Sequence, residues 1–146
     1  MSVSIFLVKF ALDSSGAYVD GRSDLIESVT VPCDLFHKLA MGTEGLQLSQ
    51  LEVFEDESRR ESFQVSCYLP NEASRLREHL REIFLDTLRK SADEVGSVSM
   101  NHLEAKVINV ILGTFKTLTN LDALLTRKLE VFCDDESVVV RVDINE

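Results

Sequence analysis

The sequence has few of the residues that interrupt or cross-link a fold. Its 146 residues include two prolines, six glycines and three cysteines, and they include no tryptophan. So few prolines and glycines leave no low-complexity linker at which the chain would divide, and we expect one globular domain over residues 1–146. The cysteines, Cys33, Cys67 and Cys133, are odd in number and have no CxxC spacing. That usage favours a reducing, cytoplasmic compartment over a disulfide framework.

Signatures of catalysis and of membrane insertion are also lacking. The sequence contains no GxxxxGK[ST], GxGxxG, GxSxG or HExxH motif. Three histidines, His37, His79 and His102, lie far from one another in sequence, so no catalytic residue, cofactor or metal ligand is assigned. The apolar run at residues 3–12 lacks a preceding basic segment and is too short to span a bilayer. It predicts a buried strand with both faces covered.

Acidic side chains outnumber basic ones, and they are unevenly spread. The net charge is −10, and residues 1–58 hold ten acids against three bases. Residues 59–90 reverse this with seven bases against five acids, mostly arginines along a helical pattern. The overall excess repels phosphate backbones and anionic lipid, so we expect no nucleic acid and no membrane as partners. A basic protein would be attracted.

One phrase occurs twice. The stretch LEVFEDES spans Leu51–Ser58, and LEVFCDDES spans Leu129–Ser137. In each copy an apolar strand precedes clustered carboxylates, and an alternating segment follows, which is the pattern of a β-hairpin. For the first copy we expect Phe63, Val65, Cys67 and Leu69 to point inward and Gln64, Ser66 and Tyr68 outward. For the second we expect Leu129, Val131 and Cys133 to pair with a return strand whose inward residues are Val138, Val140, Val142 and Ile144.

Helices are predicted between the strands. One begins near Pro32 and stops at Gly42, and a long one with a 3.6-residue apolar period runs from Glu72 to about Ala92 with Asn71 as its cap. A third begins at Asn101, which with Glu104 forms a capping box. Its segment VINVIL is apolar nearly all round, so the helix Asn101–Leu118 is a candidate homodimer interface. A shorter helical run is expected after Asn120, over residues 121–127.

This order of elements predicts an α+β fold. We expect a largely antiparallel sheet built from β-hairpins, with helices packed on one face.

The candidate binding residues are the carboxylates of the two repeated turns. They are Glu55, Asp56 and Glu57 in the first copy and Asp134, Asp135 and Glu136 in the second. Three interpretations stay open: a cation site, a docking edge for a basic protein, and polar turns that keep the protein soluble. Neither triplet has the alternating spacing that wraps a calcium ion.

Three functions follow from these observations. A small acidic α+β domain without catalytic motifs is similar in type to bacterial immunity proteins, which present carboxylates to a basic cleft. That likeness implies a non-enzymatic cytosolic protein that neutralises or chaperones a basic protein partner. The first alternative is a homodimeric, secretion-chaperone-like protein. The second is a small hydrolase or transferase whose unmarked site would be a deep pocket with perturbed titratable groups.

Overall fold

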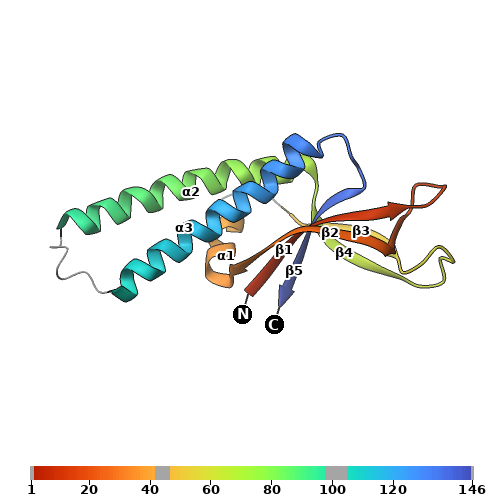
Figure 1. Ribbon diagram of the computed structural model, residues 1–146, viewed down its shortest axis with the longest axis horizontal. Helices are drawn as coiled ribbons and strands as arrows, with labels where there is room; N and C mark the ends of the chain where they lie inside the picture. Colours follow the sequence, from red (N-terminus) through yellow and green to blue (C-terminus); the bar gives the residue numbers. More distant parts are fainter. Residues whose placement is uncertain (1, 42–46, 98–104, 146) are drawn as a thin grey trace.

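The protein is an α+β structure in which a small barrel carries a long helical hairpin (Figure 1). The computed structural model describes residues 2–41, 47–97 and 105–145. The strands are β1 (Ser2–Leu12), β2 (Tyr18–Pro32), β3 (Ser49–Phe54), β4 (Ser62–Tyr68) and β5 (Val138–Asn145). The helices are α1 (Cys33–Met41), α2 (Pro70–Ser97) and α3 (Ala105–Thr126), and a π-helical turn η2 (Arg127–Val131) continues α3.

The sheet is mostly antiparallel and closes on itself in the order β1-β2-β3-β4-β5, with β5 returning to β1. The β1–β2 and β1–β5 ladders are long, whereas β2 meets β3 in parallel only at Tyr18↔Val53 and Val19↔Phe54. Two further pairs, Cys67↔Arg141 and Tyr68↔Val140, join β4 to β5. The predicted largely antiparallel sheet is therefore confirmed.

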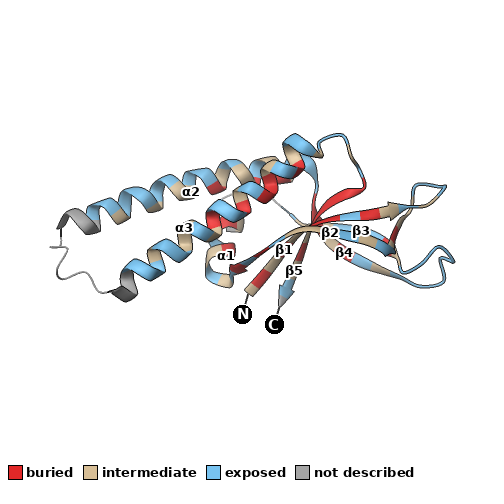
Figure 2. Cartoon of the chain, viewed as in Figure 1, coloured by how far each residue is buried: buried red, intermediate tan, exposed pale blue. Residues whose placement is uncertain are grey.

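Apolar side chains form two cores, one on each face of the sheet. The larger one packs the helices against the strands and includes Ile5 and Leu7 of β1. The smaller one is made by the strands and includes Val8 and Phe10 of the same strand. Because neighbouring residues of a strand point to opposite faces, β1 is covered on both sides, as its sequence predicts. Figure 2 shows the buried residues gathered where the helices meet the sheet, with much of the outer helical hairpin exposed.

The long helices pack against each other in antiparallel fashion. Phe84 of α2 stacks edge-on against Phe115 of α3 with ring centroids 5.0 Å apart. Further along, the Arg81 guanidinium donates to the Asp122 carboxylate at 2.9 Å. Both helices extend beyond the barrel and α1 at their far ends (Figure 1).

The first predicted hairpin is confirmed, with two corrections. β3 and β4 pair in antiparallel fashion with Leu51↔Val65 and Val53↔Phe63, so these four residues share the smaller core. Tyr68, expected outward, is buried because the helices cover that face of β4 as well, whereas Leu69, expected inward, is exposed. Leu69 lies where the strand passes into α2, and its backbone N–H donates to the Glu72 carboxylate at 2.7 Å.

The second predicted hairpin is wrong, although its return strand exists as β5, in which Val138, Val140 and Val142 are buried as expected and Ile144 is exposed. Leu129 and Val131 belong to η2, and β5 pairs with β1 and β4 instead of with residues 129–133. Buried positions continue from α3 at spacings of three and four residues, and no glycine or proline interrupts the chain there. The buried residues are Leu118, Leu121, Leu124, Leu125 and Lys128. The helical period therefore overrides the strand preference of the four-residue phrase.

Helix boundaries differ from the expectation in two places. α2 begins at Pro70, so Asn71 lies inside the first turn and is not its cap. α3 runs through Asn120 without a break, so residues 121–127 form no separate helix. The predicted stop at Gly42 and the capping box of Asn101 and Glu104 lie outside the described residues.

Candidate functional site

The first acidic triplet lies at the end of the barrel remote from the helices, in the turn between β3 and β4 (Figure 1). The Glu55 backbone N–H donates to the Glu61 carbonyl at 3.1 Å, which closes the turn and places the two side chains together. A hydrogen bond that the Glu55 carboxyl donates to the Glu61 carboxylate, followed by the charge of Glu61, raises the pKa of Glu55. Asp56 and Asp20 add to the same negative field. We call Asp20, Glu55, Asp56, Glu57 and Glu61 the acidic turn.

One ion-pair network fixes the acidic turn against the turn between β1 and β2. Arg59 adopts a positive φ of 58° and directs its guanidinium to the Asp13 carboxylate, while also lying over the Phe54 ring at 5.6 Å. Asp13 Oδ1 accepts hydrogen bonds from the backbone N–H groups of Ser15 and Ala17, both at 2.9 Å. Hydrogen bonds from the Ser15 hydroxyl, the Ala17 N–H and Arg59 hold the pKa of Asp13 well below its ordinary value.

A shallow hollow of about 370 Å³ adjoins the acidic turn. It is lined by Val19, Gly21, Arg22, Asp56, Glu57 and Ser58. β2 passes close to the turn at Gly21, where an added Cβ would meet the Glu55 carbonyl oxygen at 3.0 Å. Arg22 and Glu57 form an ion pair across the hollow at 3.4 Å, with both side chains largely exposed.

The second acidic triplet lies elsewhere, in the segment that leads from η2 into β5 (Figure 1). Asp135 accepts from the Ser137 N–H at 3.0 Å and pairs with Lys9 at 3.6 Å. The Ser137 hydroxyl, which hydrogen-bonds to the Asp135 carboxylate, lowers the pKa of Asp135. Among the described residues no ion pair joins the two triplets, and the hollow at the first triplet is lined by no residue of the second, so they form two separate acidic patches.

A more enclosed pocket of about 240 Å³ lies beside the second triplet. Lys128 of η2 is one of its lining residues and is only 4% exposed, although it carries a charge. Its ammonium donates to the backbone carbonyls of Phe132 at 3.1 Å and Asp135 at 2.9 Å. At another wall the Tyr18 hydroxyl donates to the Glu136 carbonyl at 2.9 Å. The remaining lining residues are Leu51, Cys67, Tyr68, Leu69, Pro70, Val138 and Val139. We call this the lysine pocket.

Burial moves every perturbed group of the lysine pocket towards its neutral form. It raises the pKa of Tyr68 to about 12 and raises the pKa of the Cys67 thiol, while it lowers the pKa of Lys128. Burial likewise raises the pKa of Tyr18, with the charge of Glu136 as a lesser cause. The thiol and both phenols therefore stay protonated at neutral pH, which makes them hydrogen-bond donors and poor nucleophiles.

The histidines and cysteines do not converge within the described part of the chain. His79 lies near the Lys38 carbonyl and pairs with Glu82, and His37 lies on α1. Cys67 is buried as predicted, whereas Cys133, expected on the inner face of a strand, is exposed beyond η2. Over the same described ranges, no group of three His, Cys, Asp or Glu side chains is placed to hold a metal ion.

Sequence reasoning missed Lys128 and Tyr68. A lysine between helical arginine and leucine residues is normally assigned to a solvated face. The sequence feature that indicates burial of Lys128 is its position in the apolar helical period that starts at Leu121 and Leu124. Strand alternation alone predicts that Tyr68 points outward, because the pattern does not show that both faces of β4 are covered.

Comparison of the chain with family models, with curated proteins and with solved structures finds no match. Among the helices that the structure describes, none has the length and apolar character needed to cross a membrane.

Proposed function

We propose that this protein is a non-enzymatic binding domain that recognises a basic protein partner through the acidic turn. The observation that carries the proposal is the pair Glu55 and Glu61, two carboxyls held against each other at an exposed barrel end. Like charges forced together destabilise the free protein, and a cationic side chain placed between them removes that cost. An interface with such complementary charge also gains speed of association.

The hollow beside the turn suits an arginine or lysine side chain of the partner. Asp56 and Glu57 form one wall, and Gly21 keeps the opposite wall free of a side chain. A guanidinium entering there would compete with Arg22 for the Glu57 carboxylate. Because that ion pair is exposed, exchanging one cation for another costs little.

The experiment compares two charge-reversal variants of the full chain. Asp56→Lys with Glu57→Lys changes the acidic turn, and Asp134→Lys with Glu136→Lys makes the same charge change at the second patch. Each protein, tagged, is used to capture partners from cells that produce it, and association rates with the captured protein are then measured at 0.05 M and 0.3 M salt. Over that range surface charges become strongly screened.

We expect the captured partner to be basic, and we expect its association rate to fall at least tenfold in the turn variant and in high salt. The matched variant should retain most of the rate if the second triplet lies outside the interface, and should lose a similar share if both patches contribute. A partner that binds both variants as fast as the wild type, or that is itself acidic, would refute the proposal.

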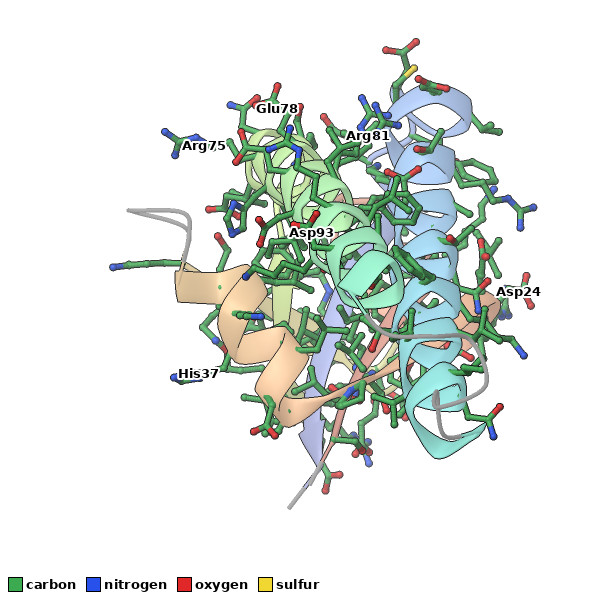
Figure 3. All side chains as sticks on the ribbon, turned by 90° about the vertical axis from the view of Figure 1, so that its left-hand side faces the viewer. Asp24, His37, Arg75, Glu78, Arg81 and Asp93 are labelled. Atoms are coloured by element: carbon green, nitrogen blue, oxygen red, sulfur yellow. The ribbon has the colours of Figure 1, made fainter. Side chains whose placement is uncertain are left out.

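A second surface favours the homodimeric alternative. On α2, Leu85 and Leu88 follow Arg81 by four and seven residues, so they share the face from which Arg81 reaches Asp122 of α3. Figure 3 shows Arg81 at the junction of the two helices and Arg75 and Glu78 on the outer side of α2. Both leucines are about half exposed.

α3 contributes a matching stripe. Ile108 and Phe115 precede Asp122 by fourteen and seven residues, so the three lie along one face, and Leu112 lies one turn from Ile108. Exposed apolar side chains of both helices thus lie in line with the residues through which α2 and α3 contact each other. We call Leu85, Leu88, Ile108 and Leu112 the seam.

A second copy of the chain fits the seam in size and charge. α3 is about 33 Å long and a helix pair about 20 Å wide, a footprint of roughly 600 Å² that is comparable to the ~800 Å² of one side of a standard interface. Between residues 108 and 120, α3 has Lys116 as its one charged residue. On α2, Glu78, Glu82 and Asp86 recur every four residues, with Glu82 paired to His79 and Asp86 to Lys90. A two-fold axis along the hairpin would set each Lys116 against that acidic row.

Sedimentation velocity tests the dimer. The interface expected on the helix Asn101–Leu118 is restricted in this proposal to the residues from 108 onward. The wild type should sediment as a dimer at micromolar concentration, and Leu88→Glu with Leu112→Glu should be monomeric. Val110→Glu is the matched control, because Val110 is equally apolar and exposed but points away from the seam. A wild type that is monomeric at 0.1 mM contradicts the dimer, and so does a seam variant that remains dimeric.

A further inference from the structure

The lysine pocket has more hydrogen-bond donors than the protein uses. An ammonium has three N–H donors, and Lys128 directs two of them to the Phe132 and Asp135 carbonyls. Within the described residues no third acceptor contacts it, and its nearest acidic neighbour, Asp135, is paired with Lys9. The π-helical turn holds this lysine against the pocket, and such turns occur frequently at functional sites.

Tyr68 supplies a second unused donor. It is 4% exposed and lines the pocket, and no described residue accepts a hydrogen bond from its hydroxyl. Among the described residues, Glu27 Oε2 is the buried side-chain polar atom that lacks a hydrogen-bond partner, and the Tyr68 hydroxyl is not such an atom, so its O–H reaches the open space of the pocket. A ligand in the pocket can therefore replace water as the acceptor of this hydrogen bond.

The walls define the rest of the ligand. Leu51, Leu69, Pro70, Val138 and Val139 are apolar and surround the two donors. The volume of about 240 Å³ lies just below the range for drug-sized ligands, so the occupant is a small molecule or a single residue.

From this arrangement we propose that the lysine pocket binds a carboxylate carried on a short branched apolar chain, with one carboxylate oxygen accepting from Lys128 and the other from Tyr68. A carboxylate oxygen is an acceptor only, which matches a site whose free groups are donors. It would also pair directly with the buried ammonium, on which the charges of Asp135 and Glu136 act without an ion pair among the described residues. This site is independent of the acidic turn.

One feature opposes the anion and provides a control. Glu136 lies at the pocket with its carbonyl bound by Tyr18, and its carboxylate repels a second negative charge there. Removing that charge with Glu136→Gln should strengthen carboxylate binding a few-fold, because the carbonyl that accepts from Tyr18 remains.

The test is a titration of the full-length protein with 4-methylpentanoate, followed by amide chemical shifts, with 4-methylpentanamide as the neutral isostere. We expect saturable shifts at residues that line the pocket, with the amide binding at least tenfold more weakly. Tyr68→Phe should weaken carboxylate binding about tenfold or more, since a hydrogen bond to a charged group is lost. Because that hydroxyl has no partner in the protein, the variant should fold like the wild type.

Lys128→Met should abolish binding, and Tyr68→Phe keeps the proposal testable if the lysine variant fails to fold. N-acetylleucine separates the two sources of such a carboxylate. Binding as tight as that of the free acid would assign the pocket to peptide C-termini, and weaker binding would assign it to free acids; both results support an anion site. No saturation by 20 mM 4-methylpentanoate, equal binding of acid and amide, or an unchanged affinity in Tyr68→Phe would overturn the proposal.

Discussion

Replacement of Lys128 by methionine isolates the structural role of its ammonium. The methionine keeps the unbranched apolar stem in place but removes the two hydrogen bonds to the Phe132 and Asp135 carbonyls. Hydrogen bonds from a charged donor contribute about 1.5–3 kcal/mol each, and relief of the buried charge offsets part of that loss. We therefore expect the free energy of unfolding to fall by about 2 kcal/mol. For a chain of this size that lowers Tm by about 4–8 °C, which calorimetry resolves.

The pH dependence gives a sharper test of the same reasoning. Burial lowers the pKa of Lys128 in the folded protein below its ordinary value of 10.5. Between those two pKa values the unfolded chain binds more protons than the folded one, so wild-type stability rises there relative to the methionine variant. The difference in unfolding free energy should thus widen as pH rises through the folded pKa towards 10.5.

Lys38→Met, at an exposed lysine of α1, is the matched control and should change stability by less than about 0.5 kcal/mol. If Lys128→Met leaves Tm unchanged, the carbonyl contacts do not stabilise this turn. If the difference in unfolding free energy between variant and wild type narrows as pH rises, hydrogen bonding outweighs burial at this lysine, and its pKa is raised on folding and not lowered.

Three further predictions concern the fold. Leu124→Ala, at a fully buried position of α3, should lower the free energy of unfolding by about 3 kcal/mol in urea denaturation, whereas Leu25→Ala at an exposed position should cost less than about 0.5 kcal/mol. Gly113→Ala should raise Tm by about 2–4 °C, because this exposed helical glycine has open space for a methyl group, and an unchanged Tm would count against it. The stability that Asp13 contributes through its lowered pKa is present above its ordinary value of 3.8 and is lost as pH falls towards the folded pKa. Acid titration should therefore show the difference between wild type and Asp13→Asn shrinking below pH 3.8, and a difference that grows with acidity would contradict the assignment.

The sequence predicts those parts of the fold in which one periodicity dominates. Alternation in residues 63–67 fits only a strand, and the apolar spacing of α2 fits only a helix. Both elements are found in the structure. The second copy of the repeated phrase is compatible with two secondary structures, because Leu129 fits both a strand pattern and the helical pattern of Leu121 and Leu125. Which pattern prevails depends on the core into which α3 packs, and a four-residue phrase does not contain that information.

The candidate sites divide in the same way. Glu55, Asp56 and Glu57 of the acidic turn are visible in the sequence because a hairpin turn keeps its carboxylates adjacent in the chain. Asp20 of β2 and Glu61 join them only through the fold. The lysine pocket combines β2, β3, β4, η2 and β5, so its residues are far apart in sequence and their patterns are those of ordinary strands and helices. The burial of Lys128 depends on carbonyls four and seven residues ahead of it, in a segment whose path follows from the pairing of β5 with β1.

The two faces of the sheet have a consequence for how this protein unfolds. Leu7 and Val8 are joined by one peptide bond yet belong to different cores, and the same is true of Cys67 and Tyr68 and of Val139 and Val140. In three strands, adjacent residues therefore belong to different cores. Neither core can lose its packing while those strands remain paired in the same register. Melting should accordingly proceed as one cooperative transition, with no intermediate in which the strand-only interior persists after the helices have detached.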